Sequence, residues 1–520
     1  MSVKAGSVVE HKESEARMTQ AGAARAAVRL AKLLRGVDVR VNSAQGDLSI
    51  SQIAYDSRKV QPGTLFIAIR GEKTDGNKFV ADALARGAIA VISDQAQPAA
   101  FPEVFPWIKV ADARKAMAIS AANYYARPAD VLKLVGVTGT NGKTTTSYLV
   151  DSILRAAGCK VGLLGTIGYR LVRESHPAPN TTPESLDLQN YLAEIVRAGG
   201  THAILEASSH ALAMDRLWGC PFAVAIFTNL TRDHLDYHKT LDDYFAAKRR
   251  LFEGTGAAAP AAAVINRDDE YGRQLAGMAS RTLTYGLEPG AEITTRKPAL
   301  SLTGIEFTAD TPSGKIEIRS KLVGRPNVYN ILAAIGAGVA LDLSQDVIAS
   351  GIAQLSAVPG RFERIDAGQP FLVIVDYAHT DDALRNLLAT AKNLNPDGRI
   401  ITLFGCGGDR DRSKRPLMGE AAGRVSDIIV LTSDNPRSED PLLIINDAIV
   451  GVQRTSAKLL VEPDRQKAIE MALDEARAGD IVLLAGKGHE TVQVLRDSTI
   501  EFDDRAVARR ILGQRGFGGD

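Results

Sequence analysis

The segment GTNGKTTT, residues 139–146, combines glycines, a lysine and hydroxyl side chains in the order that phosphate-binding loops use. It follows the apolar run VLKLVGV (131–137) and precedes an amphipathic helical pattern, so it lies at a strand-to-helix turn. Backbone N–H groups and a helix N-terminus at such a turn attract phosphates, Lys143 can reach the β- and γ-phosphates, and the Thr144 hydroxyl can bind magnesium. The segment therefore predicts an ATP or GTP site.

This loop departs from the strict G-x-x-x-x-G-K-[ST] pattern, because Val137 stands where the first glycine belongs. The alternative interpretation is a glycine-rich turn between a strand and a helix that binds no nucleotide. Even with nucleotide bound, the loop alone does not name a reaction.

A lysine lies on the apolar face of a predicted helix, LDDYFAAKRRLF (241–252). Lys248 follows Tyr244 by four residues and precedes Phe252 by four, and so shares a stripe with Leu241, Tyr244, Phe245, Leu251 and Phe252. One interpretation is that the lysine runs along the edge of the stripe and keeps its ammonium in water. The other is a desolvated, neutral amine, which can add carbon dioxide and become a metal-binding carbamate.

The segment FTNLTRDHLDYHKT (227–240) places two aspartates and two histidines, Asp233, His234, Asp236 and His238, after a buried-strand pattern. Each of them alone would be expected on the surface. As a cluster at the ligand-binding end of a strand they favour a metal site, and oxygen ligands beside phosphates suit magnesium better than zinc.

The elements that must position these groups alternate along the chain. From Val131, the runs VLKLVGV, AILEAS and AVAIFTNL alternate with helical patterns, as do FLVIVDYAH, IITLFGCGG, DIIVLTSDNP and IVLLAGKGHE after AVPGRFERI (357–365). This order predicts mainly parallel sheets with ligand sites at the carboxyl ends of the strands. With TLFIAIRG and AIAVIS in the first region, we expect an N-terminal extension and entry helix (1–45) and three α/β domains (46–130, 131–356 and 357–520).

Length and composition support several ordinary domains. The 520 residues suggest about three domains of the usual size, and 62 basic against 61 acidic side chains give a net charge of +1, which points to no nucleic acid. No apolar run approaches the ~18 residues of a membrane span, and the polar N-terminus lacks a secretory signal. The three cysteines are odd in number and far apart, which argues against a disulfide framework. We expect a cytoplasmic protein, monomeric, with small-molecule substrates.

A series of motifs carries a family resemblance: YDSRKVQPGTLFIAIRGEKTDG, NTTPE, EASSHAL, FTNLTRDHLDYH, VDYAHTDDAL, FGCGGDRDRSKRP, SDNPR and AGKGHE. In this order, from about Ile53 to the C-terminus, the chain resembles the Mur ligases, and it looks most like the member that adds the third residue of the peptide stem. GTNGKTTT is shared with the related folylpolyglutamate synthetases and is less specific.

The resemblance implies an N-terminal UDP-binding α/β domain, a central P-loop ATPase with a mainly parallel sheet, and a C-terminal Rossmann-like domain for the amino acid. It implies ATP-dependent addition of meso-2,6-diaminopimelate to the D-glutamate of UDP-N-acetylmuramoyl-L-alanyl-D-glutamate, through an acyl phosphate, in cytoplasmic peptidoglycan precursor synthesis. Mg²⁺ is the implied cofactor. We expect the third domain to close over the second about a hinge near residues 357–360.

The site residues that the resemblance implies fall into four groups. The nucleotide would contact Gly139, Thr140, Asn141, Gly142, Lys143, Thr144, Thr145, Asn327, Asn330, Arg361 and Asp376. The UDP-muramoyl dipeptide would contact Tyr55, Ser57, Glu72, Lys73, Thr74, Asn180, Thr181, Thr182, Ser208 and Arg216. Diaminopimelate would contact Arg410, Asp434, Asn435, Pro436, Arg437, Gly486 and Glu490. Magnesium would be held by Thr144, Glu206, His234 and carbamylated Lys248, the last three acting with Lys143 in catalysis. Met214 is a departure, since some relatives carry a substrate-binding glutamine there.

Three alternative functions stay open at this point. The L-lysine-adding counterpart and a folylpolyglutamate synthetase share the fold with another acceptor or amino acid, but YDSR with PGTLF and DNPR with GGDR argue against both. A P-loop switch that controls a partner is of a different class. Such a protein should not need three domains with polar clusters at the sheet edges.

Overall fold

The computed structural model describes residues 26–39, 43–71, 74–99, 101–102 and 104–518. The chain divides into two compact units. One contains the chain up to Pro128 with residues 184–193 and 215–219, and the other contains residues 129–183, 194–214 and 220–520. Helix α7 (Ser185–Arg197) has residues in both. The predicted domain boundaries themselves stay predictions.

The first unit is built on a four-stranded parallel sheet in the order β3-β4-β5-β6. Alternate residues of β4 enter two cores: Leu65 and Ile67 one, Phe66 and Ala68 the other. TLFIAIRG and AIAVIS are therefore strands, as predicted. The elements are β1 (Val28–Arg29), α2 (Leu30–Leu33), α3 (Ser43–Gly46), β2 (Ser49–Ile50), β3 (Gln52–Ala54), β4 (Thr64–Ala68), α4 (Val80–Ala85), β5 (Ala88–Ser93), β6 (Trp107–Lys109) and α5 (Ala113–Tyr124).

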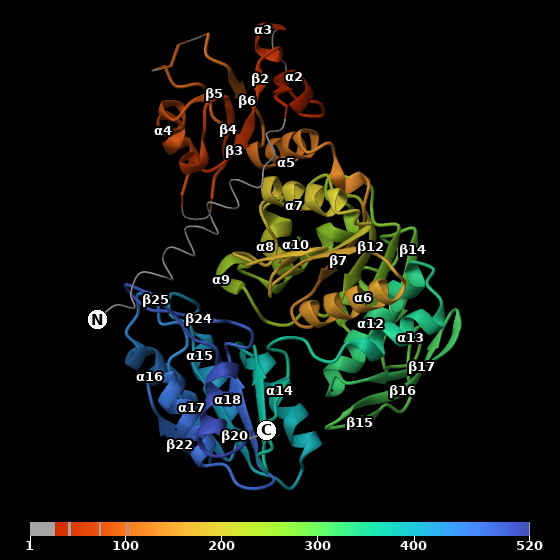
Figure 1. The fold of residues 1–520 in the computed structure, drawn as a ribbon, viewed down its shortest axis with the longest axis vertical. Coiled ribbons are helices and arrows are strands. Elements are labelled where there is room, and N and C mark those ends of the chain that lie inside the picture. The colour runs from red at the N-terminus through yellow and green to blue at the C-terminus, as the bar shows by residue number, and fades with distance from the viewer. Residues whose placement is uncertain (1–25, 40–42, 72–73, 100, 103, 519–520) are drawn as a thin grey trace. The chain divides into compact units, whose positions relative to one another are not determined.

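The second unit begins with an eight-stranded sheet in the order β10-β9-β8-β11-β7-β12-β13-β14. Its strands run parallel except for the hairpin strands β9 and β10. All three predicted strands are present, and helices α6 (Lys143–Ala156), α12 (Arg325–Ala340) and α13 (Gln345–Gln354) pack together beside them (Figure 1). The strands are β7 (Lys133–Thr138), β8 (Val161–Leu164), β9 (Tyr169–Leu171), β10 (Glu174–His176), β11 (His202–Glu206), β12 (Phe222–Phe227), β13 (Ala262–Asn266) and β14 (Arg281–Tyr285).

Helices and a small antiparallel sheet complete this part of the second unit. The helices are α6 (Lys143–Ala156), α8 (Ser209–Ala213), α9 (Leu235–His238), α10 (Leu241–Glu253), α11 (Glu270–Arg273), α12 (Arg325–Ala340) and α13 (Gln345–Gln354). The small sheet consists of β15 (Ala299–Ser301), β16 (Gly304–Thr311) and β17 (Gly314–Ser320).

Helix α10 confirms the predicted apolar stripe and the position of Lys248 on it. Thr240 caps the helix by accepting a 3.0 Å hydrogen bond from the Asp243 amide. Tyr244, Lys248 and Phe252 are buried on one face. Leu241 was expected on the same stripe but is 36% exposed, because it lies in the first turn before the helix reaches the core.

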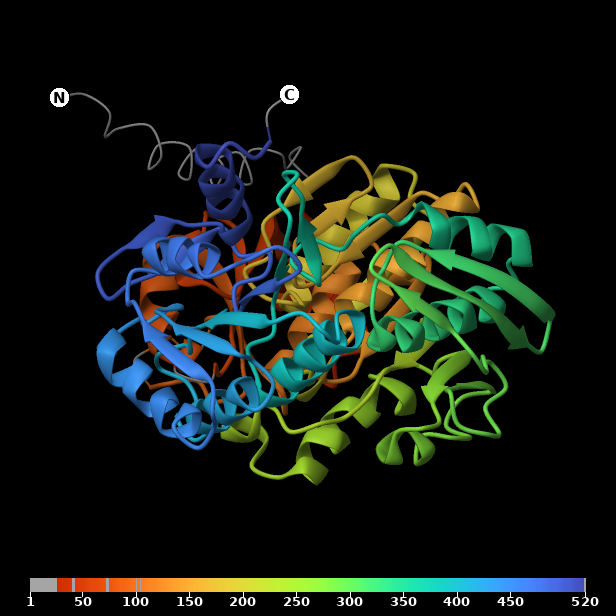
Figure 2. The same cartoon turned by 90° about the horizontal axis from the view of Figure 1, so that it is seen from below.

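The third sheet has the order β18-β19-β23-β20-β21-β22, with only β18 antiparallel to its neighbour. Alternate strand residues enter two cores, one under α14, α15 and α16 and one under α17 and α18, so helices cover both faces (Figure 2). This is the doubly wound arrangement that the sequence predicts. The strands are β18 (Glu363–Ile365), β19 (Leu372–Asp376), β20 (Ile400–Phe404), β21 (Ile428–Leu431), β22 (Lys458–Val461) and β23 (Ile481–Ala485).

The helices around this sheet are α14 (Asp381–Leu394), α15 (Lys414–Gly423), α16 (Pro441–Val452), α17 (Arg465–Asp474) and α18 (Asp504–Gln514). A hairpin of β24 (Val492–Val494) and β25 (Thr499–Glu501) follows β23. The four predicted strands β19, β20, β21 and β23 are parallel, so the polar residues after them meet at one edge of the sheet.

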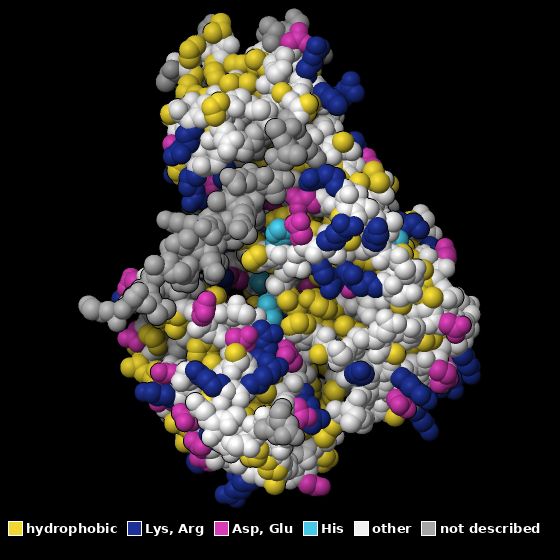
Figure 3. All heavy atoms as spheres, viewed as in Figure 1, with side chains coloured by type: hydrophobic (Ala, Val, Ile, Leu, Met, Phe, Trp, Pro, Cys, Tyr) yellow, Lys and Arg dark blue, Asp and Glu magenta, His cyan; other side chains and the backbone are white. Residues whose placement is uncertain are grey.

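The described surface carries both signs of charge. Acidic and basic side chains occur across the viewed face (Figure 3), as the near-zero net charge predicts. Within the described ranges, no helix combines the length and apolar character that crossing a bilayer requires. The cysteines are free thiols, and Cys220 and Cys406 are buried.

Candidate active site

The phosphate-binding turn forms where the sequence predicts it. Strand β7 ends at Thr138 and α6 begins at Lys143. Gly142 precedes the helix with φ +86°, and an added Cβ would lie 2.4 Å from Asn330 Oδ1, so only glycine fits. Val137, the departure from the strict loop pattern, is a buried residue of β7 and lies before the turn. The replacement of the first glycine of the pattern by Val137 therefore does not alter the turn at Gly142 and Lys143, where α6 begins.

The segment after β12 braces this loop, a role that the sequence analysis did not identify. Asn229 Oδ1 accepts a 2.9 Å hydrogen bond from the Asn141 amide, and Thr228 Oγ1 donates one of 2.6 Å to the Asn141 carbonyl. The Thr231 amide donates to Thr140 Oγ1 at 3.0 Å. The run FTNLT thus holds the loop as well as leading to the predicted metal residues.

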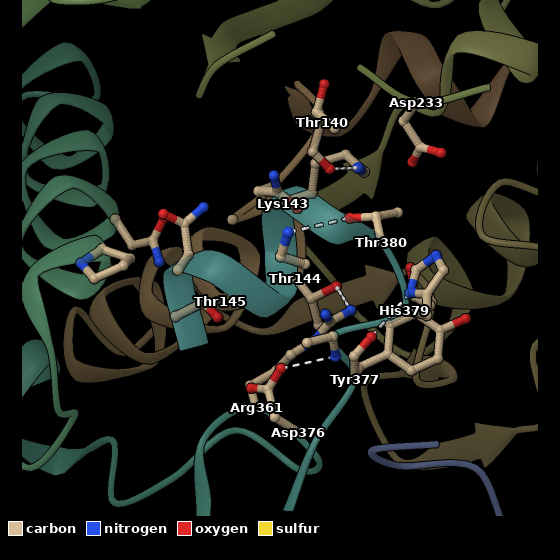
Figure 4. Close-up of a pocket in the computed structure, with 18 of the residues that line it drawn as sticks. Thr140, Lys143, Thr144, Thr145, Asp233, Arg361, Asp376, Tyr377, His379 and Thr380 are labelled. Carbon is tan, nitrogen blue, oxygen red and sulfur yellow. Dashed lines mark hydrogen bonds between the residues drawn. The ribbon is translucent and has the colours of Figure 1, made fainter. Parts of the chain in front are cut away.

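A cavity of about 290 Å³ opens beside the loop (Figure 4). The loop and α12 contribute the predicted nucleotide residues Thr140, Asn141, Gly142, Lys143, Thr144, Thr145, Asn327 and Asn330 to its lining. The third sheet contributes Arg361 and Asp376, which were predicted, and Tyr377, His379 and Thr380, which were not. The latter three follow Asp376 in VDYAHT, so strand-end position alone could have signalled them.

The Lys143 side chain folds back over the phosphate-binding loop that precedes it. Its Nζ donates to the carbonyls of Gly139 at 2.9 Å and Thr140 at 2.8 Å. Burial lowers the pKa of this lysine, and the Glu206 carboxylate counteracts the shift. The side chain is therefore held at the N-terminus of α6, where an anion is favoured.

Two of the predicted magnesium ligands are directly hydrogen-bonded. Thr144 Oγ1 donates to Glu206 Oε2 at 3.0 Å, and Glu206 is 1% exposed. Thr166, which the sequence analysis missed, donates to the same carboxylate from its amide at 3.1 Å and its hydroxyl at 2.9 Å. Three donors thus fix the orientation of the Glu206 carboxylate.

Lys248 is 1% exposed and lines the cavity, so the interpretation that it keeps its ammonium in water is wrong. Its Nζ donates to the Gly139 carbonyl at 2.7 Å and lies 4.3 Å from the centre of the Tyr244 ring. Burial and the neighbouring Lys143 charge place the pKa of Lys248 well below its usual range. A neutral amine, the species that reacts with carbon dioxide, is thereby favoured.

The predicted Asp-His cluster divides in the structure. Asp233 and His234 line the cavity, and their Oδ2 and Nε2 atoms are 3.4 Å apart. Desolvation lowers the pKa of His234 to about 3 although Asp233 opposes the shift, so its imidazole is neutral at pH 7. His238 instead packs 5.1 Å from the Tyr244 ring, and neither it nor the exposed Asp236 lines the cavity.

Residues of the third sheet approach the phosphate loop directly. Arg361 Nη2 donates to Thr144 Oγ1 at 3.4 Å, and its guanidinium lies 4.7 Å from the centre of the Tyr377 ring. Asp382 Oδ2 accepts hydrogen bonds from Asn141 Nδ2 at 2.9 Å and Thr231 Oγ1 at 3.0 Å. Asp376 instead accepts hydrogen bonds from the backbone amide of Phe362, directly before β18, at 2.7 Å and from that of Ala378, after β19, at 2.8 Å.

The predicted amino-acid residues gather at the carboxyl edge of the third sheet. Arg437 Nη1 donates to the Gly408 carbonyl at 2.7 Å, and Asn435 Nδ2 donates to Glu490 Oε2 at 2.9 Å. Gly408 permits this approach, since an added Cβ would lie 1.9 Å from the Pro436 carbonyl oxygen. Arg410 follows on the same loop and is exposed.

Around β11, the predicted dipeptide residues form a connected group. Thr182 Oγ1 donates to the Glu206 carbonyl at 2.6 Å and accepts from the Ser208 amide at 3.1 Å. Thr181 Oγ1 lies 3.2 Å from Thr166 Oγ1, and the Tyr169 hydroxyl donates to the Asn180 carbonyl.

The first unit contains the remaining predicted substrate residues. The Tyr55 hydroxyl donates to Asp187 Oδ2 at 2.5 Å, and Arg216 pairs with Glu184 at 2.9 Å. Ser57 is buried, and Thr74 is exposed. Glu72 and Lys73 lie outside the described residues.

A phosphate-binding loop, a buried lysine and the polar ends of a second α/β sheet around one cavity define a P-loop nucleotide-binding enzyme. Residues 49–125 match the "Mur ligase family, catalytic domain", 137–338 the "Mur ligase middle domain" and 360–488 the "Mur ligase, glutamate ligase domain". The chain belongs to the Mur ligase family, as the motif series predicts.

Relatives with assigned names match over most of the chain. The UDP-N-acetylmuramoyl-L-alanyl-D-glutamate–2,6-diaminopimelate ligase of Solibacter usitatus is 57% identical over 90% of this chain and 94% of its own length. The enzyme of the same name from Geobacter metallireducens is 46% identical over 94% and 100%. A solved structure with that name is 34% identical, covers 94% of this chain and 99% of its own, and superposes with a TM-score of 0.66.

The geometry of Lys143 predicts a specific loss of turnover. Lys143→Ala should lower kcat roughly 10²–10³-fold, the scale of other lost electrostatic contacts, because the cation at the helix N-terminus disappears. Alanine suits the first helical turn, so thermal unfolding should stay near that of the wild type. Lys133→Ala, on the exposed side of β7, is the matched control. Activity of Lys143→Ala within about threefold of wild type would remove the loop from the mechanism.

Proposed function

We propose that this chain uses ATP to join 2,6-diaminopimelate to the D-glutamate of UDP-N-acetylmuramoyl-L-alanyl-D-glutamate. The single observation that carries the proposal is the cavity, where the phosphate loop and the carboxyl end of β19 lie together. The names of relatives at 57% and 46% identity support the choice of substrates. The meso stereoisomer, a cytoplasmic location and a monomeric state belong to the same proposal and rest on the sequence.

Bond formation proceeds in two balanced steps. A D-glutamate carboxylate oxygen attacks the γ-phosphorus, the bond from that phosphorus to the bridging oxygen breaks, and ADP leaves with an acyl phosphate remaining. The amine then attacks the acyl carbon, loses a proton and expels phosphate. Neither step needs a covalent bond to the enzyme, and both need positioned cations and donors. Lys143 and the N–H groups of α6 occupy that role.

Acyl phosphates hydrolyse, so the reacting groups must meet where water is excluded. Asp382 and Arg361 already connect the third sheet to the phosphate loop through Asn141 and Thr144. We propose that these contacts belong to the closed arrangement in which the amine reaches the acyl phosphate, with the chain between α13 and β18 as its hinge.

Mg²⁺ would be held by Thr144, Glu206, His234 and carbamylated Lys248. The residues fit this cation, because the Thr144 hydroxyl and the neutral His234 imidazole line the cavity and the buried Glu206 carboxylate is hydrogen-bonded to Thr144. Lys248 also lines the cavity and is buried with a depressed pKa. A carbamate there would replace a buried neutral amine by an anionic oxygen ligand. When bound, the metal would neutralise charge on the phosphates.

Lys248→Ala tests the carbamate. The variant should fold and be nearly inactive, and added short carboxylic acids should partly restore turnover by supplying the missing anion. Incubation of the wild type with ¹³C-bicarbonate should give a carbamate ¹³C signal that Lys248→Ala lacks. Arg249→Ala, the exposed neighbour paired with Glu253, is the control. A fully active Lys248→Ala, or no carbamate signal in the active wild type, would contradict the assignment.

Selection of the amino acid is assigned to Arg437 with Arg410. L-Lysine differs from diaminopimelate by lacking the far carboxylate, and a guanidinium can bind a carboxylate through two parallel hydrogen bonds. The Arg437 guanidinium is oriented by its hydrogen bond to the Gly408 carbonyl, and the Arg437 backbone adopts a left-handed conformation with φ +53°. A guanidinium left without its carboxylate disfavours lysine.

The experiment compares diaminopimelate, L-lysine and L-glutamate as acceptors, with ATP, Mg²⁺ and the UDP-muramoyl dipeptide. The wild type should prefer diaminopimelate over lysine by about 10⁴-fold or more in kcat/KM. Arg437→Ala should lose most of this preference with its KM for ATP little changed, whereas the exposed Arg454→Ala should keep it. Equal turnover of the first two amino acids would contradict the assignment, and turnover of glutamate alone would favour the folylpolyglutamate alternative.

A further inference from the structure

Lys487 is a buried cation at the proposed amino-acid site to which the resemblance assigns no role. It follows β23 in the run AGKGHE and is 0% exposed. Its partners include the loop after β21, and β21 and β23 are separated by β20. Strands two positions apart lie about 10 Å from each other, so a long side chain is needed to connect their loops.

The ammonium of Lys487 contacts two residues that the proposed function places in the site. Nζ donates to Glu490 Oε2 at 2.9 Å and to Asn435 Oδ1 at 3.2 Å. Asn435 Nδ2 donates to the same Glu490 oxygen at 2.9 Å, and Asn435 Oδ1 also accepts from the Val494 amide at 3.0 Å. These bonds fix the direction of the Asn435 amide and direct both donors to one oxygen of Glu490.

Two carboxylate oxygens near Lys487 are still able to accept a hydrogen bond. Among the described residues, Glu490 Oε1 and the buried Asp434 Oδ1 accept no hydrogen bond, and Asp434 Oδ1 lies 3.6 Å from Lys487 Nζ. Arg465 also interacts with both carboxylates, but Asp504 pairs with it at 2.7 Å, so the cluster of Asp434, Glu490 and Lys487 keeps a net negative charge. An unpaired buried carboxylate oxygen is unfavourable unless a donor reaches it. The cluster is therefore suited to a cation.

We propose that Lys487 is a positioning residue that orients Glu490 and Asn435 and holds Asp434, so that the two carboxylates receive an ammonium group of the amino-acid substrate. The proposal rests on the proposed function and deepens it. Arg437 selects the far carboxylate, and the cluster of Asp434, Glu490 and Lys487 selects the ammonium next to it. The enzyme thus recognises a second complete amino-acid end, with both charges.

The test uses 2-aminopimelate, which keeps both carboxylates and one reactive amine but lacks the second ammonium. Wild-type kcat/KM should be lower for 2-aminopimelate than for diaminopimelate by about 10²-fold or more, because the cluster would lack its cation. In Lys487→Met, which keeps the length and removes the charge, this ratio should fall to within about tenfold. KM for diaminopimelate should rise about 10–100-fold, and KM for ATP should stay within about threefold.

A double-mutant cycle separates positioning from simple damage. If Lys487 acts through Glu490, the double variant Lys487→Met/Glu490→Gln should lose no more than about threefold in kcat/KM beyond Glu490→Gln alone. In Lys487→Met the Glu490 carboxylate loses the ammonium that contacts it, which can prevent folding. The double variant replaces that carboxylate by a neutral amide, so it can be measured even if Lys487→Met fails to fold. Lys458→Met, at an exposed pair with Glu475 in the same sheet, is the control.

Several outcomes would overturn the inference. The first is a wild type that uses diaminopimelate and 2-aminopimelate equally well. The second is a Lys487→Met variant that keeps the wild-type ratio of kcat/KM for the two amino acids. The third is additive losses of kcat/KM in the double-mutant cycle, with KM for ATP raised as much as KM for diaminopimelate. A wild type that uses neither amino acid would instead refute the proposed function. The two failures are therefore distinguishable.

Discussion

A half-buried lysine and a buried lysine share one carbonyl oxygen, and the rest of the site depends on this arrangement. Lys143 and Lys248 both donate to the Gly139 carbonyl, at 2.9 and 2.7 Å. Burial disfavours the charged form of Lys248, and the nearby Lys143 ammonium disfavours it further. Both effects lower the pKa of Lys248. The proposed anions, phosphates at Lys143 and a carbamate at Lys248, would relieve this constraint. The loop is thus arranged for the charge that its substrate supplies.

The third sheet holds its reactive edge with buried ion pairs of its own. Arg465 and Asp504 are 0% exposed and 2.7 Å apart, and Arg465 also donates to the Ala485 carbonyl at 3.0 Å, directly before Gly486. Arg415 pairs with Glu439 at 2.7 Å and donates to the Gly407 carbonyl at 3.2 Å. Both guanidinium groups therefore brace loops at the carboxyl edge. Pairs of this kind define geometry more reliably than they add stability, because desolvation offsets their attraction.

The sequence predicted the strands, the phosphate turn and the position of Lys248 on an apolar stripe, since these follow from apolar periodicity and glycine placement, but the burial of Lys248 was decided only by the structure. It did not predict that Asp236 and His238 leave the cavity while Asp233 and His234 line it, because a left-handed residue, His234 at φ +53°, turns the chain there. Nor did it identify Thr166, His379 or Lys487, whose roles depend on contacts between distant loops. Residue type and spacing predict which edge binds ligands, whereas tertiary hydrogen bonds decide which side chains face them.

The central claim is that the cavity activates a carboxylate by phosphorylating it. The most direct measurement follows oxygen atoms. If both oxygens of the reacting D-glutamate carboxylate are ¹⁸O, one of them becomes the bridging oxygen of the acyl phosphate. It leaves with the phosphate when the amine attacks the acyl carbon and the carbon–oxygen bond breaks. The account predicts that inorganic phosphate released with the amide contains one ¹⁸O atom, by mass spectrometry. Phosphate without ¹⁸O, formed together with the amide product, would contradict the account.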